Sequence, residues 1–129
     1  MEYGPAVESA EAARSWLKQH KNKFGHFIDG AWVGPSSRKY FDSTDPCTKE
    51  FLARIAQGSA KDVDKAVKAA KDAYWDWRTT PPLTRARYLF RLKDAFEENF
   101  EEIAAVLTTE QGKCIDEARG EVRRMIENV

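Results

Sequence analysis

The feature that most restricts the fold of this chain is a change in its hydrophobic period close to Gly58. Before this glycine, apolar residues occur in short runs separated by turn residues, as in "HFIDGAWV" and "FLARIA", which is typical of short β-strands. After it, apolar residues return every three or four positions, which is typical of amphipathic helices. The sequence therefore predicts an α/β protein in which short N-terminal strands are followed by three to four helices.

Turn residues divide the first part of the chain into strands. The pair Asp29-Gly30 suits a type I′ turn, because both central positions of that turn need a positive φ angle. We therefore expect a hairpin between Phe27-Ile28 and residues 31–33. Further strands are expected at "KYFDST", which is closed by Asp45-Pro46, and at "FLARIA", which is residues 51–56.

Caps and prolines divide the second part into helices. Ser59 and Asp62 resemble a capping box, so the first long helix is expected to begin there and to end before Pro81-Pro82. A second helix is expected from about Leu83 to a break at Asn99, which forms another cap pair with Glu102. The residues expected to face inward are Val63, Val67, Ala70, Tyr74, Trp77, Ala86, Leu89, Phe90, Leu92, Phe96, Ile103, Val106 and Leu107.

The last helix follows Gly112, a residue suited to the left-handed position that ends a helix. Its apolar stripe contains Ile115, Ala118, Val122, Met125, Ile126 and Val129. An apolar stripe needs a partner surface to bury it, and little of the chain remains to supply one. We therefore expect a chain that is cut short, the alternative being a helix that simply ends at the C-terminus.

Composition limits the classes of partner. The 129 residues contain 21 Lys plus Arg and 21 Asp plus Glu, so the net charge is zero and offers no electrostatic footprint for nucleic acid. No run approaches the roughly 18 apolar residues of a membrane span. Two cysteines are too few for a disulfide framework, and no signal peptide is recognisable. These features predict a cytoplasmic protein without nucleic-acid or membrane partners.

The cysteines and histidines lack the neighbouring residues that a nucleophile or a zinc ligand needs. Cys114 lies near the start of the last helix and is interpreted as a partly buried cysteine rather than a nucleophile, and Cys47 lies in a turn and is interpreted as unreactive. His20 and His26 have no carboxylate or cysteine at a zinc-ligand spacing, which favours surface histidines.

Three other motifs are interpreted as structural. Gly112-Lys113 resembles the end of a phosphate-binding loop, but Leu107 and Cys114 occupy the positions where that motif needs glycine and Ser or Thr. The segment Trp75–Arg78 could be a binding platform, but it is interpreted as core plus anchor. Paired carboxylates can act as acid and base, but here they are interpreted as a solvated helix exterior; these residues are Glu97, Glu98, Glu101 and Glu102.

The order of the elements resembles a known family. "FIDGAWV", "STDPCTKEFLARIAQGSAKDVDKAVKAAKDAYWDW", "RARYLFRL" and "LTTEQGKCIDEARGEV" together resemble the N-terminal region of the NAD(P)-dependent aldehyde dehydrogenase superfamily, over residues 24–129. The start of the chain is similar to aldehyde dehydrogenase family 16, whereas the end is closer to methylmalonate-semialdehyde dehydrogenases, which leaves the subfamily open. The near-helical spacing of Ala12, Ala13, Trp16 and Leu17 predicts a helical arm at residues 1–23, and the resemblance implies part of a Rossmann-like domain at residues 24–129.

The resemblance also implies a function. Members oxidise an aldehyde to an acid or acyl thioester with NAD or NADP, as dimers or tetramers. The family's nucleophilic cysteine, oxyanion-binding asparagine, catalytic glutamate and main nucleotide-binding segments all lie downstream of the matched region. No catalytic or cofactor-binding residue is therefore expected here, and neither Cys47 nor Cys114 matches the nucleophile. The fragment alone is expected to be inactive; the alternative is a non-catalytic interaction or oligomerisation module.

One site and two departures from the family pattern remain. In some members a monovalent cation is held by backbone carbonyls and an acidic side chain at positions that match Ser43, Thr44 and Glu110, although aspartate is usual at the last. Asp45 replaces the usual asparagine of the turn that follows. Lys49 replaces its glycine, so a positive φ angle and strain of about 1 kcal/mol are expected at Lys49.

Overall fold

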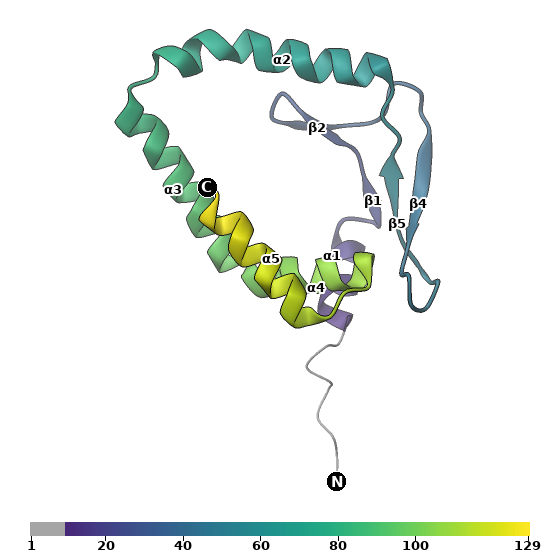
Figure 1. Ribbon diagram of the computed structural model, residues 1–129. Coiled ribbons are helices and arrows are strands. Elements are labelled where there is room, and N and C mark those ends of the chain that lie inside the picture. Colours follow the sequence, from purple (N-terminus) through teal and green to yellow (C-terminus); the bar gives the residue numbers. More distant parts are fainter. Residues whose placement is uncertain (1–9) are drawn as a thin grey trace.

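The computed structural model describes residues 10–129 and shows a small mixed sheet joined to a long helical segment (Figure 1). Residues 1–9 of the predicted arm lie outside the described part. The elements follow in the order α1 (Glu11–Gln19), β1 (Lys23–Phe24), β2 (His26–Ile28), β3 (Ala31–Val33), β4 (Tyr40–Thr44), β5 (Phe51–Ala56), α2 (Ala60–Thr79), α3 (Pro82–Glu98), α4 (Phe100–Gln111) and α5 (Ile115–Glu127). The α/β class is confirmed, with four helices after the strands.

The strands form two small sheets. In the first, β5 is central, with β1 parallel to it on one side and β4 antiparallel on the other. In the second, β2 and β3 form the predicted hairpin, and its turn residues Asp29 and Gly30 have φ angles of 55° and 72°. Positive φ at both positions is the signature of the type I′ turn, so this prediction is confirmed.

The beginning of α2 is held by one carboxylate. Asp62 Oδ2 accepts hydrogen bonds from the backbone N–H of Ser59 at 2.9 Å and from its hydroxyl at 2.7 Å. Asp62 Oδ1 accepts a third from the backbone N–H of Ser36, at 2.9 Å. The cap predicted from sequence therefore also holds the loop that precedes β4, and Asp62 is only 4% exposed.

The break between α3 and α4 lies at Asn99, as predicted, but the predicted cap pair with Glu102 is wrong. The side chain of Asn99 makes no capping bond to α4. Its Nδ2 atom donates to the carbonyl oxygen of Ala95 at 2.8 Å, so it satisfies an acceptor in the last turn of α3 instead. Carbonyl groups at a helix end lack intrahelical partners, which explains this choice.

Two apolar clusters hold the rest together. The first joins α1 to the sheet through Leu17, Leu52 and Ala53. The second joins α4 to α5, and its buried members are Ala104, Ile115, Ala118 and Val122. The predicted stripe of the last helix is thus buried where it faces α4, whereas Val129 follows the end of α5 and is 38% exposed.

The apolar faces of α2 and α3 lie outside both clusters. Figure 1 shows α2 leading away from the sheet and α3 returning toward α4 and α5. Asp62 is the one buried residue of α2, and α3 has none. The expectation that their apolar stripes face inward is wrong for most of the residues named, which are exposed within residues 10–129, whereas Ala86 and Phe96 of α3 are half-buried; the exposed members include Val63, Val67, Tyr74, Trp77, Leu89, Phe90 and Leu92.

None of the described helices is both long enough and apolar enough to cross a membrane.

Candidate functional site

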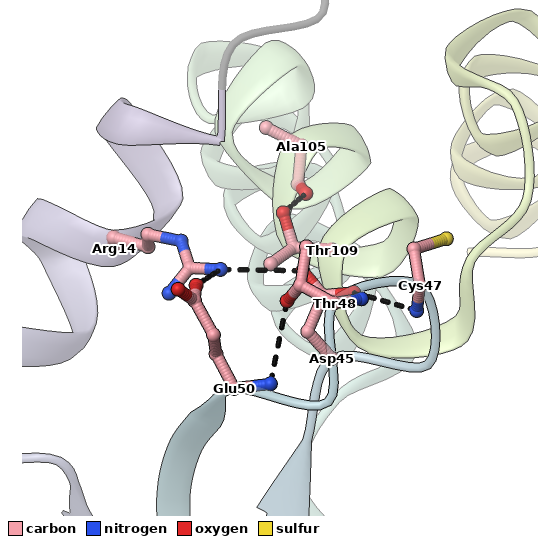
Figure 2. Close-up of polar contacts among 7 residues, drawn as sticks. All are labelled: Arg14, Asp45, Cys47, Thr48, Glu50, Ala105 and Thr109. Atoms are coloured by element: carbon pink, nitrogen blue, oxygen red, sulfur yellow. Dashed lines mark hydrogen bonds and ion pairs between the residues drawn. The ribbon is translucent and has the colours of Figure 1, made fainter.

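A network of polar contacts surrounds the turn between β4 and β5 (Figure 2). Asp45 Oδ1 accepts hydrogen bonds from the backbone N–H groups of Cys47, at 2.8 Å, and Thr48, at 3.1 Å. An Asp or Asn side chain that bonds the backbone two residues ahead forms an Asx turn. Asp45 is 8% exposed, so these bonds satisfy a carboxylate that is largely withdrawn from water.

Arg14 connects this turn to α1. Its Nη2 atom lies 3.2 Å from Asp45 Oδ2 and 2.8 Å from Glu50 Oε2. The backbone N–H groups of Thr48 and Cys47, and more weakly Arg14, hold the pKa of the Asp45 carboxyl below its usual value. Aspartate in place of the family's asparagine supplies a charged oxygen for Arg14 while the other oxygen serves the turn. Sequence reasoning found the turn but missed Arg14, because no local pattern links residues this far apart.

Lys49 occupies the positive-φ position of the turn, with φ at 63°. Its backbone N–H donates to Asp45 O at 2.8 Å, and its Nζ atom donates to Pro46 O at 2.7 Å. The expected positive φ angle is confirmed.

The structure brings together two of the three residues predicted to surround a cation. Ser43 Oγ donates to Glu110 Oε1 across 3.5 Å, which joins β4 to α4. Both residues line a cavity of about 170 Å³ between α1, the sheet and α4, whose other lining residues are mostly apolar. Thr44 is exposed at the end of β4, opposite Phe51. The cation site stays a prediction, since it needs backbone carbonyls rather than side chains; residues 10–129 contain no group of three His, Cys, Asp or Glu side chains arranged for a metal.

Both cysteines are exposed, so the interpretation of Cys114 as partly buried is wrong. Cys47 lies in the turn after β4, and Cys114 is the N-cap residue of α5. Each belongs to a loop at the surface, where apolar neighbours do not cover the side chain.

Both residues of the segment Gly112-Lys113 make contacts within the chain. Gly112 ends α4 with φ at 82°, which confirms the predicted left-handed position. A Cβ atom at Gly112 would lie 2.7 Å from Pro46 Cγ, so a larger residue would clash there. The Lys113 ammonium binds Glu121 Oε1, and this bond lowers the pKa of the Glu121 carboxyl. Because the Lys113 ammonium is paired and the backbone N–H of Gly112 donates to Thr108 O, this loop does not form a phosphate cradle.

The two histidines differ in exposure and in hydrogen bonding. His20 is exposed, as expected, and its Nδ1 atom lies 2.9 Å from Trp16 O. His26 is half-buried beside Gly58, and its enclosed Nε2 atom lacks a hydrogen-bond partner within the described part of the chain. The interpretation as a surface histidine is therefore wrong for His26.

The acidic run makes ion pairs on the helix exterior. Glu101 binds Arg119, with oxygen–nitrogen distances of 2.9 and 3.1 Å, and Glu97 binds Lys93 at 2.6 Å. Carboxylates paired with basic side chains in this way agree with the interpretation of a solvated face. The interpretation of Trp75–Arg78 as core is wrong, because Trp75 is 63% exposed and Trp77 is 44% exposed.

Comparison with known proteins identifies the family. A family model described as "Aldehyde dehydrogenase family" matches residues 32–129. Malonate-semialdehyde dehydrogenase 2 of Geobacillus thermodenitrificans is 43% identical over 104 residues, which are 81% of this chain and 22% of the relative. Malonate-semialdehyde dehydrogenase of Halalkalibacterium halodurans is 43% identical over 107 residues, which are 83% of this chain and 22% of the relative.

Solved structures agree with this assignment. HpcC from Thermus thermophilus superposes with a TM-score of 0.87 and 33% identity, over 99% of this chain and 25% of that chain. PnpE in complex with nicotinamide adenine dinucleotide superposes with a TM-score of 0.76 and 35% identity, over 80% of this chain and 21% of that chain. The chain thus spans about a fifth to a quarter of the length of the proteins it matches. It belongs to the aldehyde dehydrogenase family, and it corresponds to the N-terminal region of that fold.

Proposed function

We propose that this chain is the N-terminal part of an NAD(P)-dependent oxidoreductase that oxidises an aldehyde to an acid or an acyl thioester. The observation that carries this proposal is the family match over residues 32–129, together with identities above 40% to malonate-semialdehyde dehydrogenases. The relatives' names favour a semialdehyde as the substrate to test first.

Within that enzyme, the role of this chain is structural. Residues 24–129 form the first part of the catalytic unit, and residues 1–23 form an arm in front of it. The family match begins within the hairpin, and α1 packs on β5 through Leu17, which supports this division. The Asp45 turn anchors the arm to the sheet through Arg14.

The chemistry is supplied by other parts of the enzyme. This follows the family pattern, in which the nucleophilic cysteine, the catalytic glutamate and the main nucleotide-binding segments lie downstream of the region matched here. We therefore expect NAD or NADP to be held elsewhere in the complete protein.

The test is an activity assay on two polypeptides, the natural full-length product and residues 1–129 alone. Malonate semialdehyde is supplied with NAD or NADP, with and without coenzyme A, and reduced nicotinamide is followed by absorbance. We expect activity from the full-length product and none from residues 1–129. Activity of residues 1–129, or a full-length product inert toward malonate semialdehyde and simple aldehydes, would contradict the proposal.

A second candidate is a non-catalytic module that assembles with other subunits. The exposed apolar faces of α2 and α3 favour it, since such faces are typical of interaction surfaces. The mass of the native polypeptide, measured by immunoblot against these residues, separates the two candidates. A product of about 14.7 kDa supports the module, whereas a product several times larger supports the enzyme. The homo-oligomer expected for the enzyme is tested by light scattering of the purified product.

A further inference from the structure

The two cysteines, distant in the sequence, lie on neighbouring loops. Cys47 belongs to the turn between β4 and β5, and Cys114 ends the loop at residues 112–114 that joins α4 to α5. The contact between Pro46 and Gly112 shows that these loops touch, because a Cβ atom at Gly112 would lie 2.7 Å from Pro46 Cγ.

The sulfur of Cys47 lies on the side of its turn that faces the second loop. A Cβ atom at Gly112 would lie 3.8 Å from Cys47 Sγ, which is ordinary van der Waals contact. Figure 2 shows this sulfur pointing away from the other residues drawn. Cys114 follows Gly112 by two residues, and two residues span at most about 7 Å. A disulfide joins Cα atoms about 4.4–6.8 Å apart, so the bond forms when the loop at residues 112–114 brings Cys114 toward Cys47.

Both thiols are free and exposed, so a small oxidant can reach either one. The loop at residues 112–114 contains Gly112, whose positive φ angle glycine tolerates at no steric cost. Accessible thiols with a second thiol in reach are the arrangement found in oxidation-sensitive pairs.

We propose that Cys47 and Cys114 form a reversible redox pair that is oxidised by hydroperoxides. The peroxide oxidises one thiol to a sulfenic acid and is itself reduced to an alcohol, or to water if it is hydrogen peroxide. The second thiol then attacks the sulfenic sulfur, the S–S bond forms, and one water leaves. A dithiol reductant reverses the reaction by exchange. The bond links the Asp45 turn to the start of α5, and it is independent of the aldehyde oxidation proposed above.

The test is peptide mapping of the natural full-length polypeptide after treatment with hydrogen peroxide, with remaining thiols blocked before digestion. Trypsin releases Cys47 within the peptide Tyr40–Lys49 and Cys114 within the peptide Cys114–Arg119. We expect these two peptides to appear joined, with the loss of two hydrogens, and to separate on reduction. The yield of joined peptide is expected not to depend on protein concentration, because the bond forms within one chain.

Two variants make the test specific. Cys114→Ser is expected to abolish the joined peptide and to leave Cys47 with sulfenic, sulfinic or sulfonic acid. The relocation control combines Cys47→Ser with Ser37→Cys, which keeps two exposed thiols but places one in the loop before β4. It is expected to form no intramolecular bond. Separate over-oxidation of the two cysteines in the natural chain, or joined peptides only between chains, would overturn the proposal. Equal joining in the relocation control would show that the pairing is unspecific and would overturn it as well.

Discussion

Lys49 is one of the described residues with backbone strain, because its φ angle of 63° is costly for a residue with a Cβ atom. We expect Lys49→Gly to raise the free energy of unfolding by up to about 1 kcal/mol. The control is Lys49→Ala, which removes the ammonium but keeps the Cβ atom, and it is expected to give no gain. Urea denaturation measures both. A stabilisation of equal size in both variants would assign the effect to the lost charge instead.

Asp45 is the residue on which the turn depends. Asp45→Ala leaves the backbone N–H groups of Cys47 and Thr48 without their acceptor, and it leaves Arg14 with Glu50 alone. We expect the melting temperature to fall by about 5 °C, since losing partners of withdrawn polar groups is destabilising. Asp45→Asn keeps one acceptor oxygen and should lose less. Asp42→Ala is the control, because Asp42 is 60% exposed and its pairing with Arg54 is weak. An equal loss in Asp42→Ala would contradict the assigned role.

At the scale of elements, we expect Asp62 at the start of α2 to make the free energy of unfolding depend on pH. Hydrogen bonds from Ser36, and then from Ser59, lower the pKa of Asp62 well below its ordinary 3.8. A carboxyl whose pKa is lower in the folded state contributes stability above its unfolded pKa, and this contribution is lost as pH falls through the folded value. We therefore expect the free energy of unfolding to decrease from about pH 5 downward.

The variant Asp62→Asn tests this cause. It is expected to be less stable at neutral pH, because an amide cannot accept all three bonds, and to show a smaller further loss in acid. Denaturation by urea at a series of pH values provides the measurement. An acid dependence unchanged in Asp62→Asn would show that other carboxyls are responsible.

At the scale of the whole molecule, we expect the exposed apolar faces of α2 and α3 to determine whether residues 1–129 self-associate. Leu83 and Phe90, one heptad apart on α3, are 67% and 64% exposed. We expect residues 1–129, produced alone, to bind an apolar fluorescent dye and to self-associate. Replacing Leu83 and Phe90 by lysine should reduce both, whereas Glu98→Lys changes charge without removing apolar surface and should not. A sharp melt of a dye-free monomer would contradict this prediction.

Local order was predictable because it depends on neighbouring residues. The turn at Asp29-Gly30, the strand at residues 51–56, the cap at Ser59 and the left-handed Gly112 each depend on backbone preferences that short sequence windows express. The family was recognisable for a related reason, since the order of such windows is itself distinctive.

The tertiary structure alone decided which side chains meet and which surfaces remain uncovered. Arg14 reaches Asp45, Ser43 reaches Glu110, and the loop of Cys47 meets the loop before Cys114, all across long separations in the sequence. Periodicity identified the apolar faces of α2 and α3 but could not tell whether anything covers them, because burial depends on what lies opposite a helix and not on the helix itself.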